Sequence, residues 1–76
     1  MKMLSYRVLF KKEPEGGFTV FVPSLEGCIT YGKDLPEAKK NAREAIELYI
    51  ESLKSDHLPI PTDENLLEYN LKITNA

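Results

Sequence analysis

The chain has 76 residues, with 10 basic and 12 acidic side chains, a net charge of −2 at pH 7 and 42% hydrophobic residues. This length predicts one small domain over residues 1–76, whose core supplies about 3–5 kcal/mol of net stability, and we therefore expect a homo-oligomer. The acidic balance argues against direct binding of nucleic acid through phosphate neutralisation and favours a basic partner.

Cysteine content and hydropathy indicate the cellular compartment in which the protein is expected. Cys28 is the single cysteine, so neither an internal disulfide nor a multi-cysteine metal site can form within one chain. No stretch approaches the roughly 20 apolar residues of a membrane span, and Met1–Arg7 has no long apolar run that would mark a targeting signal. We expect a cytoplasmic protein that does not associate with membranes.

The N-terminal part of the chain has the alternating pattern of strands joined by turns. Residues 4–11 place Tyr6 and Phe10 on one side and Leu9 on the other, which predicts a first strand. Glu13–Gly17 contains a proline and two glycines, which are typical of a reversing connection. Residues 18–22 and 28–31 alternate in the same way. Three antiparallel strands are therefore expected before residue 34.

A long amphipathic helix is expected from Asp34 to about Ser55. Asp34 and Glu37 have the spacing of a capping box, and Pro36 lies in the first turn, where a missing N–H costs nothing. One apolar arc of roughly 140° on the helical wheel contains Leu35, Ala38, Ala42, Ala45, Ile46, Tyr49, Ile50 and Leu53. Leu48 lies outside this arc and is a candidate contact for a partner.

The residues after the helix predict a fourth strand. Pro59 and Pro61 lack an N–H and restrict the residues before them, so the helix cannot continue through them. Residues 67–73 then alternate apolar and polar side chains. The expected fold is α+β, in the order β-β-β-α-β, with the helix packed on one face of the sheet.

One helix covers one face of a sheet, so the other face must meet water or a partner. If the helix covers the side that carries Val8 and Val20, the opposite side, here named the uncovered face, is also partly apolar. The predicted contacts for a partner or for a second copy of the chain are Leu9, Phe21, Ile29, Tyr31 and, on the helix, Leu48. A shift of one residue in strand register would instead place some of these side chains in the core.

The sequence shows no recognisable catalytic or metal-binding constellation. The strands bring no carboxylates or histidines together, so neither acid–base nor two-metal catalysis can be assigned. Cys28 has no neighbouring signal that would activate a thiolate and is expected to be a buried apolar residue. His57 stands alone near the helix end, where its charge suits the helix dipole. We therefore expect no enzymatic activity and no cofactor.

Several short motifs occur together along the chain. They are Gly16–Phe18, Val22–Pro23, Leu25–Cys28, Thr30, Gly32, Asp34–Ala38 and Ile60–Pro61. In this order they resemble the HicB-like antitoxin family, and the resemblance runs from about Leu4 to Ile73. Its most specific part is the glycine-rich series that precedes the helix.

The resemblance implies a degenerate, partial ribonuclease-H-like fold and the role of antitoxin in a type II toxin–antitoxin pair. The implied partner is a small basic HicA-like toxin, which cleaves messenger RNA and looks like a double-stranded-RNA-binding fold. Longer members continue into a DNA-binding domain, whereas this sequence stops at Ala76, so autorepression by this chain is not expected. Glu13, Glu15 and Glu26 are the expected rim charges. The alternative function is a stand-alone RNA-associated or ligand-binding module without catalytic activity.

Overall fold

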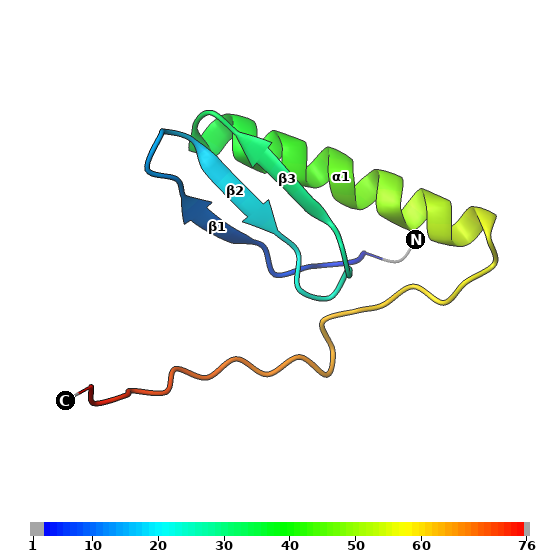
Figure 1. Cartoon of the computed structure of the whole chain (residues 1–76). Coiled ribbons are helices and arrows are strands. Elements are labelled where there is room, and N and C mark those ends of the chain that lie inside the picture. The colour runs from blue at the N-terminus through cyan, green and yellow to red at the C-terminus, as the bar shows by residue number, and fades with distance from the viewer. Residues whose placement is uncertain (1–2, 76) are drawn as a thin grey trace.

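The computed structural model describes residues 3–75 and places three strands before one helix. The strands are β1 (Leu9–Lys12), β2 (Phe18–Phe21) and β3 (Ile29–Gly32), and the helix is α1 (Leu35–Ser55). The strands form one antiparallel sheet in the order β1-β2-β3, as Figure 1 shows. This arrangement confirms the α+β fold, the three-stranded sheet and the long helix.

The N-terminus of α1 is capped by the acidic residues that the sequence indicates. Asp34 Oδ1 accepts a hydrogen bond from the backbone N–H of Glu37 at 2.9 Å. Glu37 Oε2 in turn accepts one from the backbone N–H of Lys33 at 2.7 Å. These bonds satisfy one donor in the first turn of the helix and one donor just before the capping residue. Within residues 3–75, no helix is both long and apolar enough to cross a membrane.

The C-terminus of α1 closes with a Schellman pattern of hydrogen bonds. The Leu58 N–H donates to the Leu53 carbonyl at 2.9 Å, and the His57 N–H donates to the Lys54 carbonyl at 3.1 Å. This pattern needs one residue in the left-handed conformation, which is usually glycine. Here that residue is His57, with φ of 56°. His57 therefore adopts a backbone conformation that L-residues disfavour.

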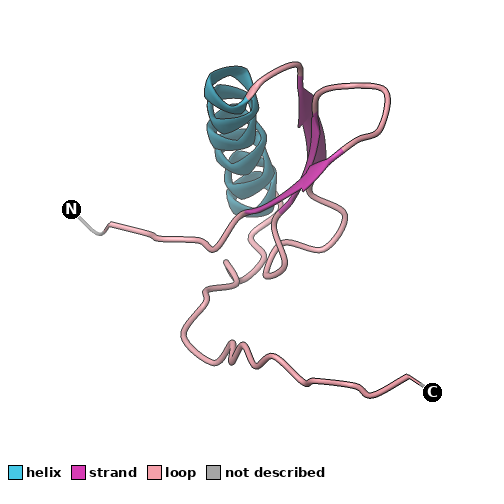
Figure 2. Ribbon diagram, turned by 90° about the vertical axis from the view of Figure 1, so that its left-hand side faces the viewer, coloured by secondary structure: helices cyan, strands magenta, loops and turns pink. Residues whose placement is uncertain are grey.

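The molecule has two layers, with α1 lying on one face of the sheet (Figure 2). The two parts of the core are Val20 with Ala38 and Ala42, and Val22 with Leu25 and Cys28. Val8 packs against both parts, which confirms the covered side that the alternation predicts. Leu25 is 1% exposed although it lies in a turn, and the sequence pattern did not mark it as a core residue.

Most of the predicted apolar arc of α1 faces the sheet. Ala38 and Ala42 are buried, and the residues of the arc that follow them are half-buried. Leu35, in the first turn, is the exception and is 42% exposed. Gly32 allows the helix to come close to β3, because a Cβ at this position would lie 2.4 Å from the Cα of Ala38.

Strand β1 is shorter than the sequence predicts, whereas β2 and β3 agree with the prediction to within one residue at each end. The alternation begins at Leu4, but β1 begins at Leu9, which pairs with Phe21. The same register would place Arg7 opposite Pro23, and a proline has no N–H for the ladder. Strand β1 therefore begins at Leu9, opposite Phe21, which is the last residue of β2.

The predicted fourth strand is not formed, and the observed order is β-β-β-α. Residues 58–75 contain no strand in the structure. Asp63 accepts hydrogen bonds from the backbone N–H of Arg7 and the hydroxyl of Ser24, and Glu68 pairs with Arg7 at 3.3 Å. Beyond this attachment, the chain runs clear of both layers in Figures 1 and 2. An alternating pattern is a strand only where another strand lies beside it, and here none does.

Candidate functional site

The uncovered face carries a row of apolar side chains, one from each strand. Leu9 pairs with Phe21 and Phe21 pairs with Ile29, so the three residues lie side by side across the sheet. Because neighbouring strands are about 4.8 Å apart, the row spans about 10 Å. Leu9 is 46% exposed, Ile29 is 59% exposed and Phe21 is half-buried. This register excludes the alternative in which a shift of one residue moves these side chains into the core.

Tyr31 lies on the same face, two residues beyond Ile29 along β3, and is 51% exposed. Its hydroxyl donates to the carbonyl of Gly16 at 3.0 Å, which holds the ring against the turn between β1 and β2. A Cβ at Gly17 would lie 2.0 Å from the Tyr31 hydroxyl oxygen, and Gly17 has φ of 80°. The glycine pair thus serves both the turn and the position of the tyrosine, a contact that the sequence did not indicate.

Leu48 is separate from the other four predicted contact residues. It lies on α1 and is 66% exposed. Because α1 covers the opposite face of the sheet, a partner seated on the row of Leu9, Phe21 and Ile29 does not also reach Leu48 by a flat contact. The structure therefore gathers four of the five residues into one surface and leaves Leu48 as an isolated exposed leucine.

The predicted rim charges have different environments. The Glu13 carboxylate accepts a hydrogen bond from the hydroxyl of Thr19 at 2.5 Å and is half-buried. Glu15 and Glu26 are exposed. Lys11, which pairs with Thr19, adds a positive charge to the same face. Lys11 and the Glu13–Thr19 pair therefore bring both signs of charge to the side of the apolar row, whereas Glu15 and Glu26 are exposed in the neighbouring turns.

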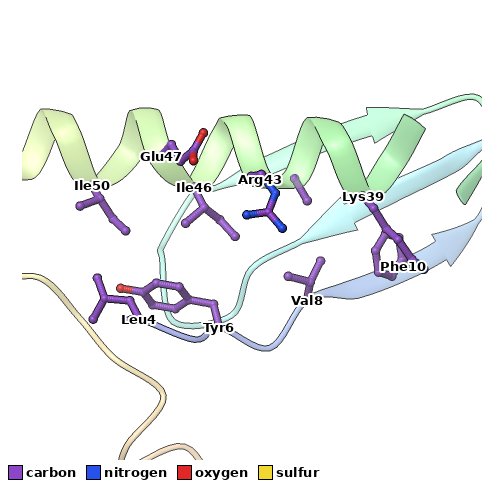
Figure 3. Close-up of a pocket in the computed structure, with 10 residues that line it drawn as sticks. Leu4, Tyr6, Val8, Phe10, Lys39, Arg43, Ile46, Glu47 and Ile50 are labelled. Carbon is purple, nitrogen blue, oxygen red and sulfur yellow. The ribbon is translucent and has the colours of Figure 1, made fainter. Parts of the chain in front are cut away.

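A groove with a volume of about 490 Å³ lies on the covered side, between the N-terminal residues and α1. Its apolar walls come from Leu4, Tyr6, Val8, Phe10, Ile46 and Ile50. Figure 3 shows Leu4 and Tyr6 on one side and Ile46 and Ile50 on the other. Lys39, Arg43 and Glu47 of α1 also line it. The helix thus leaves the β1 side of the sheet only partly covered.

Asp63 is a structural residue that the sequence did not single out. Hydrogen bonds from the Ser24 hydroxyl and the Arg7 backbone, together with the Arg7 charge, hold the pKa of its carboxyl below the usual value. Burial, with the negative charge of Asp63, raises the pKa of Tyr6, whose hydroxyl donates to the Pro61 carbonyl at 2.5 Å. These contacts join residues that are 39 to 56 positions apart in the sequence. No local pattern marks such a contact.

The structure places Cys28 and His57 away from the uncovered face. Cys28 is 6% exposed in the core, and burial raises the pKa of its thiol, so the thiol stays protonated near neutral pH. His57 lies at the C-terminal end of α1. Among residues 3–75, no group of three or more His, Cys, Asp or Glu side chains could hold a metal ion.

Comparison with known proteins gives one consistent family. The sequence model of a protein family, described as the HicB-like antitoxin of bacterial toxin–antitoxin systems, matches residues 6–75. A UPF0150 protein of Synechocystis sp. is 43% identical over 67 residues, covering 88% of this chain and 85% of that protein. UPF0150 proteins of Thermoplasma acidophilum (47% identity, 79% and 87% coverage) and Helicobacter pylori (43% identity, 86% and 90% coverage) are similar. The chain therefore belongs to the HicB-like antitoxin family.

Proposed function

We propose that this protein is an antitoxin that binds and inhibits a small basic HicA-like toxin, which cleaves messenger RNA. Membership of the HicB-like antitoxin family supports the general role. The structural observation that carries the contact is the apolar row of Leu9, Phe21 and Ile29, with Tyr31 beside it, on the face opposite α1. Side chains of this kind form the water-excluding centre of protein interfaces.

Inhibition of this kind requires the burial of apolar side chains at the interface and a favourable charge on the antitoxin, and it requires no catalysis. The net charge of −2 attracts a basic partner and speeds its encounter with the chain. Phe21 and Tyr31 are the anchors, because aromatic side chains provide large contact areas at low entropic cost. Glu15 and Glu26 are exposed, so each contributes little to affinity and acts mainly on the rate of association. The toxin is inhibited because the antitoxin occupies its RNA-binding surface.

Co-expression of this chain with a small basic HicA-like toxin from the same genome tests the proposal. We expect the wild-type chain to relieve the growth arrest of bacterial cells that express the toxin and to co-purify with the toxin from their cytoplasm. Phe21→Asp should lose both effects, because it places a charge at the centre of the apolar row. Leu48→Asp is the matched control, since Leu48 is also an accessible apolar residue, 66% exposed, but lies on the other layer. Unrelieved growth arrest and no recovered complex, with both proteins soluble, would contradict the proposal.

We also propose that the chain forms a homo-oligomer, for which Leu9, Phe21 and Tyr31 are the contacts that the sequence suggests. The small core and the exposed apolar side chains support self-association. A second copy and the toxin would then compete for the same surface. A contact elsewhere on the chain would remove this conflict.

The groove beside α1 favours a second candidate function, an RNA-associated or ligand-binding module. Its apolar walls and the nearby charges of Lys39 and Arg43 are typical of a site for a small ligand. Binding of RNA by the chain can be measured from the change in fluorescence anisotropy when the chain is added to labelled single-stranded RNA. Saturable binding that is lost in Arg43→Glu would favour it over the antitoxin.

A further inference from the structure

The C-terminal segment, residues 66–74, has the side-chain pattern of a strand with one buried face. Its large apolar side chains are exposed: Leu67 by 93%, Tyr69 by 82%, Leu71 by 76% and Ile73 by 81%. They alternate with polar residues, so in an extended chain all four lie on one side. A contiguous apolar row of this length marks a contact with another protein surface.

The sheet offers one open edge for such a strand. Strand β1 lies at the end of the β1-β2-β3 order, and no described strand pairs with its outer side. At the opposite edge, the side-chain amide of Asn41 in α1 donates to the carbonyl of Tyr31 at 2.7 Å. Helix α1 thus closes part of the β3 edge but leaves β1 with unpaired backbone groups, which attract a further strand.

The groove beside α1 fits the apolar side of an added strand. It adjoins β1, and its walls include Phe10 from that strand and Ile46 and Ile50 from the helix (Figure 3). In a strand added to β1, alternate side chains would point toward α1 and the others toward the uncovered face. The apolar residues of the C-terminal segment would enter the groove, while Glu68, Asn70 and Lys72 would stay in water.

The segment leaves the groove of its own chain empty. It is attached near Arg7, through Asp63 and Glu68, and then extends away from the body in both views. The radius of gyration is 14.7 Å, whereas a compact domain of this length has about 11 Å. The projecting apolar segment of one copy is therefore complementary to the empty apolar groove of a second copy.

We propose that two copies of this chain exchange residues 66–74, each segment forming a fourth strand on the β1 edge of the other copy. The apolar side chains fill the groove beneath Ile46 and Ile50, and a two-fold axis relates the two contacts. This dimer uses the β1 edge and the groove and leaves Phe21 and Tyr31 free. It does not depend on the identity of the toxin, and it is tested without one.

Light scattering on matched variants tests the exchange. Wild type and Asn70→Asp should have the mass of a dimer, whereas Leu71→Asp should have the mass of a monomer. Leu71 is 76% exposed in the single chain, so a charge there should leave the helix signal in circular dichroism unchanged. Phe21→Asp should remain dimeric. A monomeric wild type, equal masses for the Leu71 and Asn70 variants, or a monomeric Phe21→Asp would overturn the proposal.

Cross-linking distinguishes exchange from a strand that folds back on its own chain. The variant Lys11→Cys/Lys72→Cys/Cys28→Ser carries one thiol on β1 and one on the polar side of the segment. A flexible bis-maleimide should join two chains and give a product of dimer mass. A product of monomer mass, with the thiols joined within one chain, would overturn the exchange.

Discussion

Gly32→Ala tests how closely α1 packs on β3. A Cβ at Gly32 would lie 2.3 Å from the backbone N of Ala38, 2.4 Å from its Cα and 2.8 Å from its Cβ. Ordinary contact begins at 3.4 Å, so the helix must move by about 1 Å, because backbone atoms cannot rotate away. Overpacking of this kind costs about 1–3 kcal/mol, out of about 3–5 kcal/mol for a domain of this size. We expect the variant to lose about half of its stability.

Urea denaturation followed by the helix signal in circular dichroism measures this loss. With a slope of about 1 kcal/mol per molar urea, the midpoint should fall by about 1–3 M. Gly16→Ala is the matched control, because its φ is 110° but no atom lies within 4 Å of the added Cβ. It should show only the conformational cost, about 1–2 kcal/mol. A Gly32→Ala variant that unfolds at the wild-type midpoint would refute the close approach of helix and strand.

Three further predictions concern the helix end, the C-terminal attachment and catalysis. His57→Gly should raise the free energy of unfolding by about 0.5–1 kcal/mol, because φ of 56° suits glycine, and an unchanged midpoint would argue against the Schellman end. The pKa of Asp63 is below its ordinary value of 3.8, so its carboxylate stabilises the fold above that pH and the contribution is lost as the pH falls through the lower folded value. Asp63→Asn should therefore be less stable than wild type near neutral pH, with a gap that narrows below about pH 4, and a gap independent of pH would contradict this. The purified protein should not cleave RNA or DNA with magnesium or manganese, and cleavage that follows the protein through purification and disappears when an Asp or Glu is replaced would contradict a purely inhibitory role.

The sequence predicts the sheet and the helix well because their signals are local. Alternation in residues 18–22 identifies the covered and uncovered sides of β2, and the Asp34–Glu37 spacing marks the start of α1. The uncovered face follows from these two facts, since Leu9, Phe21 and Ile29 have the opposite phase to the core residues. Its role in binding a partner stays a prediction.

The remaining features depend on contacts between distant residues. Residues 67–73 alternate like a strand, but the pattern does not say which chain supplies the neighbouring strand. Leu25 lies in a turn yet is buried, because the turn folds back under the residues around Tyr49, whose hydroxyl donates to the Glu26 carbonyl at 2.8 Å. Asp63 binds to Arg7 and Ser24 across long separations in sequence. Short-range periodicity does not contain this information.

The most direct test of the proposed function is the affinity of the purified chain for the small basic HicA-like toxin that the proposal names, measured by isothermal titration calorimetry. Phe21 lies at the middle of the apolar row, so Phe21→Asp should weaken binding by at least about 2 kcal/mol, or about 30-fold. Leu48→Asp should bind like the wild type, because Leu48 lies on the other layer. Wild-type affinity in Phe21→Asp, with its fold intact by circular dichroism, would contradict binding through the uncovered face.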